Sequence, residues 1–263
     1  MITIILAAGK GSRLKLKTKS KFAYSIPFLM LTPDILKQKN INVEDEFLVE
    51  NIFKGLKNIN SSFLFVLGYK FLNVTPLLSY LMHKYGKRVD YVVNTKYYKT
   101  NTGYSLLLAL EAIIGEDNDY LDDILIINGD NFLSNDAWKK ILEKIKENKS
   151  FIVVDTYKKL TAESFKVKIE NKKIINMGKN INISSSTGEF IGVSFLRKED
   201  VLPFFNILKD LVNRNKNIYY DLAFKNFSQI YDLDYLYLQG ELWTEIDFKE
   251  DLENLKKILT NNC

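Results

Sequence analysis

The chain has almost none of the cysteine and histidine on which many catalytic and metal sites depend. It contains one cysteine, Cys263, and one histidine, His83, in 263 residues. A disulfide framework and a cysteine-based metal site are therefore excluded within one chain. Residues 71–85 follow the apolar spacing of an amphipathic helix, which favours a partly exposed structural role for His83. Any catalysis is expected to depend on Asp, Lys, Arg and a metal ion.

Long apolar runs and a strong net charge are also lacking. No run approaches the roughly 20 residues of a membrane span, and a strand-like run opens the sequence where a signal peptide would have a basic segment. We therefore expect no membrane span and a cytoplasmic location. The 37 basic and 32 acidic residues leave a formal charge of +5. No basic stripe with interleaved aromatics is present, so nucleic acid is not an expected partner.

Strand-length apolar runs alternate with helix-period segments through the first half of the chain. This alternation predicts parallel strands with right-handed crossovers in an open α/β sheet. The segment 22–45 fits neither pattern and is expected to form a loop or flap. The expected strands are 2–8, 62–68, 88–94, 123–128, 151–155, 165–169, 172–177, 189–196 and 230–238, and the expected helices are 46–58, 71–85, 104–114, 135–147, 198–213, 219–228 and 248–259.

A glycine-containing loop follows the first expected strand. Residues 6–14 read Leu-Ala-Ala-Gly-Lys-Gly-Ser-Arg-Leu. Glycines let the backbone approach a ligand and present N–H groups to it, and Arg13 adds a permanent planar cation. The spacing is neither that of a Walker loop nor that of a dinucleotide fingerprint. Further lysines follow at 15, 17, 19 and 21, and such a cluster of cations favours an anion such as a triphosphate.

Two aspartates lie at or near the ends of expected strands. Asp130 follows the apolar run 124–127 and an Asn-Gly pair, and Asp247 follows Trp-Thr-Glu-Ile. Taken singly, Asp130 is also explained as a turn residue and Asp247 as a helix N-cap. Ligands bind beyond the carboxyl ends of strands in open parallel sheets. Together with the glycine loop, the two carboxylates therefore predict a Mg²⁺ site, since this ion takes a few hard oxygen ligands from protein and the rest from phosphate and water.

The opening motif at 6–14 resembles the signature of the sugar-phosphate nucleotidyltransferase superfamily. Further stretches match one branch of it, the CTP-dependent enzymes that activate small phosphorylated head groups: phosphocholine, 2-aminoethylphosphonate, inositol-1-phosphate and phosphoglutamine cytidylyltransferases. The stretches 98–106 and 127–130 resemble motifs of this branch, and 165–169, 188–193 and 242–247 follow in the expected order. The likeness extends over nearly the whole chain apart from 22–45.

The resemblance implies a Rossmann-like, mostly parallel sheet flanked by helices, with a smaller mixed α+β acceptor-side region, as in nucleotide-diphospho-sugar transferases. We expect one domain over 1–263, in which 1–150 mainly binds nucleotide and 151–263 mainly binds the acceptor and supplies the second metal aspartate. The superfamily usually has Pro-Lys after the glycine loop, where this chain has Thr18-Lys-Ser-Lys-Phe22. The catalytic lysine is assigned to Lys21, and Lys19 stays open as its alternative.

The resemblance also implies roles for individual residues. The implied reaction transfers CMP from CTP to a phosphate or phosphonate oxygen of a small acceptor and releases pyrophosphate, a step in making head-group or cell-surface glycan precursors. The cofactor is Mg²⁺, and a homodimer is left open. The implied residues are Arg13, Lys21 and Asp130 for catalysis; Leu6, Ala7, Ala8, Gly9, Gly11, Ser12, Arg13, Asn101 and Ser105 for the nucleotide; Lys166, Glu189 and Trp243 for the acceptor; and Asp130 and Asp247 for the metal.

The acceptor itself has two interpretations. Aromatic side chains could form a box for a quaternary ammonium, or Glu189 could pair with an ammonium or bind hydroxyls. The aromatic candidates are Tyr97, Tyr98, Tyr219, Tyr220 and Trp243. Two other functions stay open: a sugar-1-phosphate thymidylyl- or uridylyltransferase on the same fold, and a non-catalytic nucleotide-binding homologue.

Overall fold

The structure, a computed structural model, describes residues 1–11, 48–115 and 121–261. The strands in these ranges are β1 (Ile2–Ala7), β2 (Ser62–Leu67), β3 (Val89–Val93), β4 (Ile124–Asn128), β5 (Asn131–Leu133), β6 (Phe151–Asp155), β7 (Lys166–Glu170), β8 (Lys173–Gly178), β9 (Gly188–Leu196), β10 (Asp234–Leu238) and β11 (Trp243–Glu245). The helices are α2 (Glu50–Gly55), α3 (Thr75–Tyr85), α4 (Thr102–Ile114), α5 (Asn135–Ile145), α6 (Lys198–Arg214), α7 (Asp221–Phe227) and α8 (Lys249–Asn261), with 3₁₀ turns η2 (Phe71–Asn73) and η4 (Ile183–Ser185).

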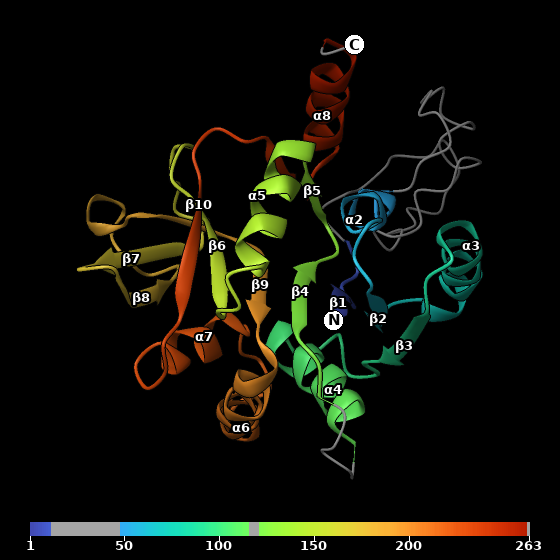
Figure 1. The fold of residues 1–263 in the computed structure, drawn as a ribbon, viewed down its shortest axis with the longest axis horizontal. Coiled ribbons are helices and arrows are strands. Elements are labelled where there is room, and N and C mark those ends of the chain that lie inside the picture. Colours follow the sequence, from blue (N-terminus) through green and yellow to red (C-terminus); the bar gives the residue numbers. More distant parts are fainter. Residues whose placement is uncertain (12–47, 116–120, 262–263) are drawn as a thin grey trace.

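A central sheet runs through the described part of the chain (Figure 1). Its strand order is β10-β6-β9-β4-β1-β2-β3, and the β7–β8 hairpin joins it beside β9. Strand β1 is parallel to β2 and β4, β2 is parallel to β3, and β10 is parallel to β6. Strand β9 is antiparallel to both of its neighbours, β4 and β6. The expected α/β class with a mostly parallel sheet is confirmed, and the antiparallel strand at its centre is an addition to it.

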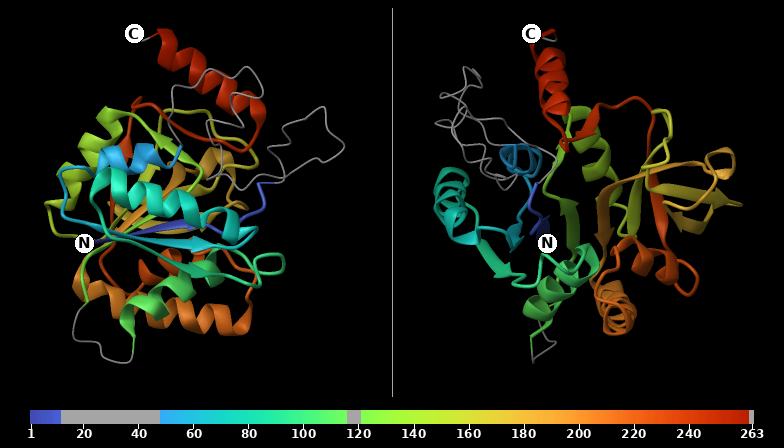
Figure 2. Two further views of the ribbon diagram at one scale, coloured as in Figure 1. Left: turned by 90° about the vertical axis from the view of Figure 1, so that its right-hand side faces the viewer. Right: turned by 180° about the vertical axis from the view of Figure 1, so that it is seen from behind.

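Helices cover both faces of this sheet (Figures 1 and 2). Along β1, Ile4 and Leu6 join the core under α4, α6 and α7, whereas Ile5 joins the core under α2, α3 and α5. Successive side chains of a strand point to opposite faces, so a strand covered on both faces reads as the continuous apolar run found at residues 4–6. The two cores thus fix the carboxyl ends of β1 and β4 side by side.

Two expected elements are shorter in the structure. The helix expected at 46–58 spans Glu50–Gly55, and the chain then turns, with the N–H groups of Lys57 and Ile59 bonded three residues back. The strand expected at 230–238 begins only at Asp234, because residues 230 and 231 still donate to the carbonyl of Phe227 at the end of α7.

Helix α8 projects from the body of the molecule (Figure 2). Its Leu255 packs with Ile246, Leu48 and Phe132 in a small separate apolar cluster. Within the ranges described, none of the helices combines the length and apolar character needed to cross a membrane.

Candidate active site

A pocket of about 610 Å³ opens at the carboxyl ends of β1 and β4. These two strands are parallel and in register, with Leu6 opposite Asn128. The glycine loop that follows β1 and the Asn-Gly-Asp turn that follows β4 therefore come to the same edge of the sheet. Gly129 lies so close to the carbonyl oxygen of Leu6 that a Cβ there would be 3.0 Å from it, which explains why the turn carries a glycine.

A two-stranded ribbon brings the two predicted metal aspartates to this pocket. Strand β5, directly after Asp130, pairs antiparallel with β11, and Glu245 lies opposite Asn131. The N–H of Ile246 donates to the carbonyl of Asp130 at 3.0 Å. Asp130, Glu245 and Asp247 therefore line one wall of the pocket, although more than a hundred residues separate them in sequence.

Glu245 is strongly affected by its surroundings. Burial and, after it, the neighbouring charges of Asp130, Asp247 and Glu189 together raise the pKa of Glu245 to about 8, while Lys158 opposes the shift. A carboxyl that holds its proton near neutral pH because it is buried among like charges is a group that a cation would ionise. Glu245 lies in the stretch 242–247, but the sequence alone predicted no role for it.

The donor set fits Mg²⁺ bound with its substrate. Asp130, Glu245 and Asp247 offer hard oxygen ligands at one wall. Within the described residues no group of three or more Asp, Glu, His or Cys side chains is placed so that it could hold a metal ion by itself. Mg²⁺ is usually held by one or two carboxylates and completed by substrate phosphates and water, so an open arrangement is the one expected for it.

Because the pKa of Glu245 is raised, replacing this residue with an uncharged one is predicted to stabilise the protein, and to do so more at high pH than at low pH. The carboxyl of Glu245 has a pKa near 4.5 in the unfolded chain and about 8 in the folded protein. Between these two pH values the folded protein binds more protons than the unfolded chain. The free energy of unfolding therefore falls as pH rises from about 4.5 to about 8. We expect Glu245→Gln to raise the melting temperature relative to the natural chain on the order of 5 °C more at pH 9 than at pH 5.

Thermal unfolding of the metal-free protein at both values measures this effect. The matched control is Glu111→Gln, at an exposed position on α4. If the melting temperatures of Glu245→Gln and the natural chain differ by the same amount at pH 5 and at pH 9, Glu245 is not held protonated by its surroundings.

Two further carboxyl groups line the same pocket. Glu189 on β9 is partly buried, and burial raises the pKa of its carboxyl, with Lys158 opposing. Asp221, at the start of α7, is 5% exposed, and burial raises the pKa of its carboxyl to about 7, with the Lys179 ammonium opposing. Both residues line the pocket, and Asp221 was not predicted. This part of the pocket is therefore suited to a cationic or hydroxyl-rich ligand.

Close contacts surround the side chain of Asn128, which also lines the pocket. The buried Tyr220 donates its hydroxyl to Asn128 Oδ1 at 3.3 Å. Gly192 on β9 has a φ of +74°, and a Cβ there would lie 2.3 Å from Asn128 Nδ2. Close approach and backbone conformation both require glycine at this position.

The first loop lies at the rim of the pocket as far as the structure describes it. Leu6, Ala7, Gly9 and Gly11 line the pocket, together with Lys10, whereas Ala8 is buried beneath them. The predicted Ser12, Arg13 and Lys21, the alternative Lys19 and the expected flap at 22–45 lie outside the described residues.

The start of α4 supplies one of its two predicted residues to the pocket lining. Asn101 lines the pocket. The N–H of Thr102 donates to the side chain of Asn101, and the N–H of Gly103 donates to the carbonyl of Ile218. Ser105 is buried, and its Oγ accepts a hydrogen bond from Asn94 at 3.0 Å. The nucleotide-binding roles of Asn101 and Ser105 stay predictions.

Lys166 and Trp243 also do not line the pocket. Lys166 is 1% exposed, and its Nζ donates to the carbonyl groups of Thr161, Ala162 and Ser164, so it ties down the preceding loop. The lysine that reaches the acidic wall is Lys158, whose Nζ lies 3.7 Å from the centre of the Trp243 ring and donates to the carbonyl of Trp243. The acceptor roles expected of Lys166 and Trp243 stay predictions, and Lys158 joins them as a candidate.

The five candidate aromatics do not converge on one box. Tyr219 and Tyr220 line the pocket, whereas Tyr97 and Tyr98 pack on each other edge to face outside it. The Tyr219 ring faces the Lys179 ammonium at 5.9 Å. Charge, more than aromatic enclosure, therefore distinguishes this part of the pocket.

Comparison with known proteins agrees with this geometry. A family model described as a domain of unknown function (DUF6564) matches residues 37–164, and no curated protein matches the sequence. A solved CTP:phosphocholine cytidylyltransferase from Streptococcus pneumoniae is 25% identical, with a TM-score of 0.67 over 98% of this chain and 99% of that one. An inositol-1-phosphate CTP transferase from T. maritima is 18% identical, with a TM-score of 0.73 over 98% and 94%. A nucleoside-diphosphate-sugar pyrophosphorylase from Vibrio cholerae RC9 is 16% identical, with a TM-score of 0.71 over 98% and 100%.

The fold is thus that of a nucleotidyltransferase. The neighbours include cytidylyltransferases as well as enzymes of nucleoside-diphosphate sugars. The resemblance to the sugar-phosphate nucleotidyltransferase superfamily and to its cytidylyltransferase branch, and the class of enzyme that it implied, are confirmed at this level.

Proposed function

We propose that the chain is a Mg²⁺-dependent cytidylyltransferase that transfers CMP from CTP to a small phosphorylated acceptor. The observation that carries this proposal is the meeting of Asp130, Glu245 and Asp247 beside the glycine loop, at the carboxyl ends of β1 and β4. An oxygen of the acceptor phosphate attacks the α-phosphorus of CTP, the bond from that phosphorus to the β-phosphate oxygen breaks, and pyrophosphate leaves with the electron pair. The acceptor oxygen is already anionic, so no general base is required.

Different residues of the chain would bind the triphosphate and hold the metal ion. Gly9 and Gly11 allow the triphosphate to lie close to the backbone, and Arg13 and Lys21 are proposed to neutralise its charge during transfer. Asp130 and Asp247 would hold Mg²⁺, with Glu245 beside them. When bound, the ion polarises the α-phosphate and offsets its negative charge.

We further propose that the acceptor bears a cationic group. Glu189 and Asp221 both line the pocket, and burial raises the pKa of each carboxyl. An ammonium group would lower both pKa values and be held by the resulting charges. The likeness to a phosphocholine-specific enzyme supports the same class of acceptor.

The nucleotide is tested by comparing CTP, UTP and dTTP with one acceptor mixture and identifying the products by mass spectrometry. We expect a CMP-linked product to dominate. A dominant UMP- or dTMP-linked sugar would favour the thymidylyl- or uridylyltransferase alternative, to which the nucleoside-diphosphate-sugar pyrophosphorylase neighbour is related. A chain that binds nucleotide but forms no product would favour the non-catalytic homologue.

A further inference from the structure

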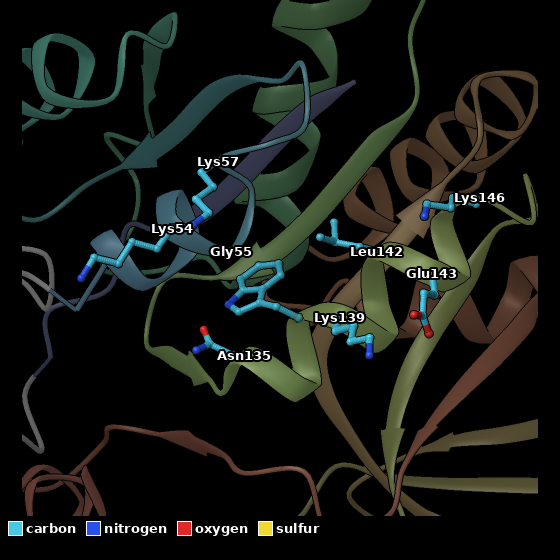
Figure 3. A pocket seen from close by; sticks show the side chains of 9 residues that line it. Lys54, Gly55, Lys57, Asn135, Lys139, Leu142, Glu143 and Lys146 are labelled. Carbon is cyan, nitrogen blue, oxygen red and sulfur yellow. The ribbon is translucent and has the colours of Figure 1, made fainter. Parts of the chain in front are cut away.

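A second cleft, separate from the candidate active site, lies between α2 and α5 (Figure 3). Its volume is about 610 Å³, which is within the usual range for small-molecule sites. Lys54 and Lys57 line it on the α2 side, where the Lys54 side chain extends outward, and Lys139 and Lys146 belong to α5 and the residue after it (Figure 3). Glu143 is the only acidic residue in its lining. The cleft therefore has a clear excess of positive charge.

The cleft has a formed floor. Trp138 is 3% exposed, and a Cβ at Gly55 would lie 2.3 Å from its ring, so the glycine lets α2 approach α5 closely. The indole Nε1 donates to Asn51 Oδ1 at 3.3 Å, and Leu142 continues the apolar surface along α5. The lysines thus surround a fixed concave surface.

The lysines of α5 fall into two groups. Lys140 pairs with Glu241, and Lys144 pairs with Glu147 and Asp234. Lys139 and Lys146, seven residues apart and so on one face of the helix, line the cleft. Among the residues that the structure describes, neither makes an ion pair or a side-chain hydrogen bond, and the same holds for Lys57 across the cleft. Of the four lysines on α5 and at its end, the two that line the cleft are therefore the two without a carboxylate partner among the described residues.

We propose that this cleft binds a small phosphorylated ligand, independently of the reaction proposed above. Lysine ammonium groups bind phosphate as compact point charges, and several of them around one concavity suit a ligand with more than one phosphate. Only nine residues line the cleft, fewer than the roughly 20–30 per partner of a stable protein interface, which favours a small ligand over a protein segment.

Inorganic tripolyphosphate is the probe, and Trp138 is the reporter. The chain has two tryptophans, so Trp243→Phe leaves Trp138 as the single emitter. We expect a saturable change in its emission. The double variant Lys139→Gln/Lys146→Gln should raise the apparent Kd at least tenfold, whereas the matched control Lys198→Gln/Lys209→Gln, at exposed positions on α6, should leave it unchanged.

Calorimetric titration of the chain with both tryptophans intact provides an independent measurement. The natural chain should bind one more equivalent of tripolyphosphate than the Lys139→Gln/Lys146→Gln variant. Equal stoichiometry and affinity in the two proteins would overturn the proposal. Emission that does not saturate, or that saturates alike in the variant and the natural chain, would overturn it as well.

Discussion

Replacing Asp130 with Asn is expected to lower turnover by about 10³-fold, the scale on which removal of one charge-stabilising group acts in a preorganised site. Asp130 lies at the turn between β4 and β5, and its backbone carbonyl accepts a hydrogen bond from the N–H of Ile246. Asn preserves the size of the side chain and this backbone bond, but it removes the charge. The loss should therefore appear in kcat with CTP and Mg²⁺, while the melting temperature without Mg²⁺ stays equal to or above that of the natural chain, since one like charge beside Glu245 is gone.

Asp247→Asn should have an effect of similar size, and the double variant should be little worse than either single variant. Groups that act through one ion are strongly non-additive. Mg²⁺ should raise the melting temperature of the natural chain and have no effect on either variant, a readout that does not depend on turnover. The control is Asp210→Asn, at an exposed position on α6. Turnover within about tenfold of the natural value in both single variants would contradict the assignment of the metal site.

Asp221→Asn is expected to lower kcat/KM for phosphocholine by about 100-fold, because removing one partner of a buried charge pair costs several kcal/mol. For inositol 1-phosphate, whose ring is uncharged, the same substitution should change kcat/KM far less. Glu189→Gln should show the same contrast between the two acceptors. An equal loss with both acceptors would mean that these carboxyl groups maintain the pocket and do not recognise a cation.

Asp221 also predicts how affinity for the acceptor depends on pH. Its carboxyl has a pKa of about 7, so it is mostly neutral at pH 6 and mostly ionised at pH 8. An ammonium is attracted only by the ionised form, so the KM for phosphocholine should fall as pH rises through 7. In Asp221→Asn this part of the pH dependence should be lost.

The sequence predicts most of the sheet and only part of the site. Strands such as Ile2–Ala7 and Ile124–Asn128 are long apolar runs, and the expected ranges 2–8 and 123–128 differ from them by a residue at an end. The three-residue strands β5 and β11 are too short to show a period-two pattern. They nevertheless bring Asp130 and Asp247 together, and the geometry of that ribbon could not be derived from spacing.

The roles of the lysines could not be predicted from the sequence either. In the stretch 165–169, Lys alternates with apolar residues, a pattern that places two lysines on one side of a strand without saying what covers that side. The structure covers Lys166 with backbone carbonyls of the preceding loop. Lys158, in a loop with no periodicity, reaches the acidic wall because Asp155 accepts hydrogen bonds from the N–H groups of Tyr157 and Lys158 and fixes the turn. Such contacts depend on tertiary packing and leave no mark in the local sequence.

Pyrophosphate release from CTP tests the central claim most directly. The purified chain is incubated with CTP, Mg²⁺ and a mixture of phosphocholine, phosphoethanolamine, 2-aminoethylphosphonate, inositol 1-phosphate and phosphoglutamine. The proposed function predicts release that requires an acceptor, stops with EDTA and is nearly absent in Asp130→Asn. Release that continues unchanged in EDTA or in Asp130→Asn, or no release with any of these acceptors, would contradict it.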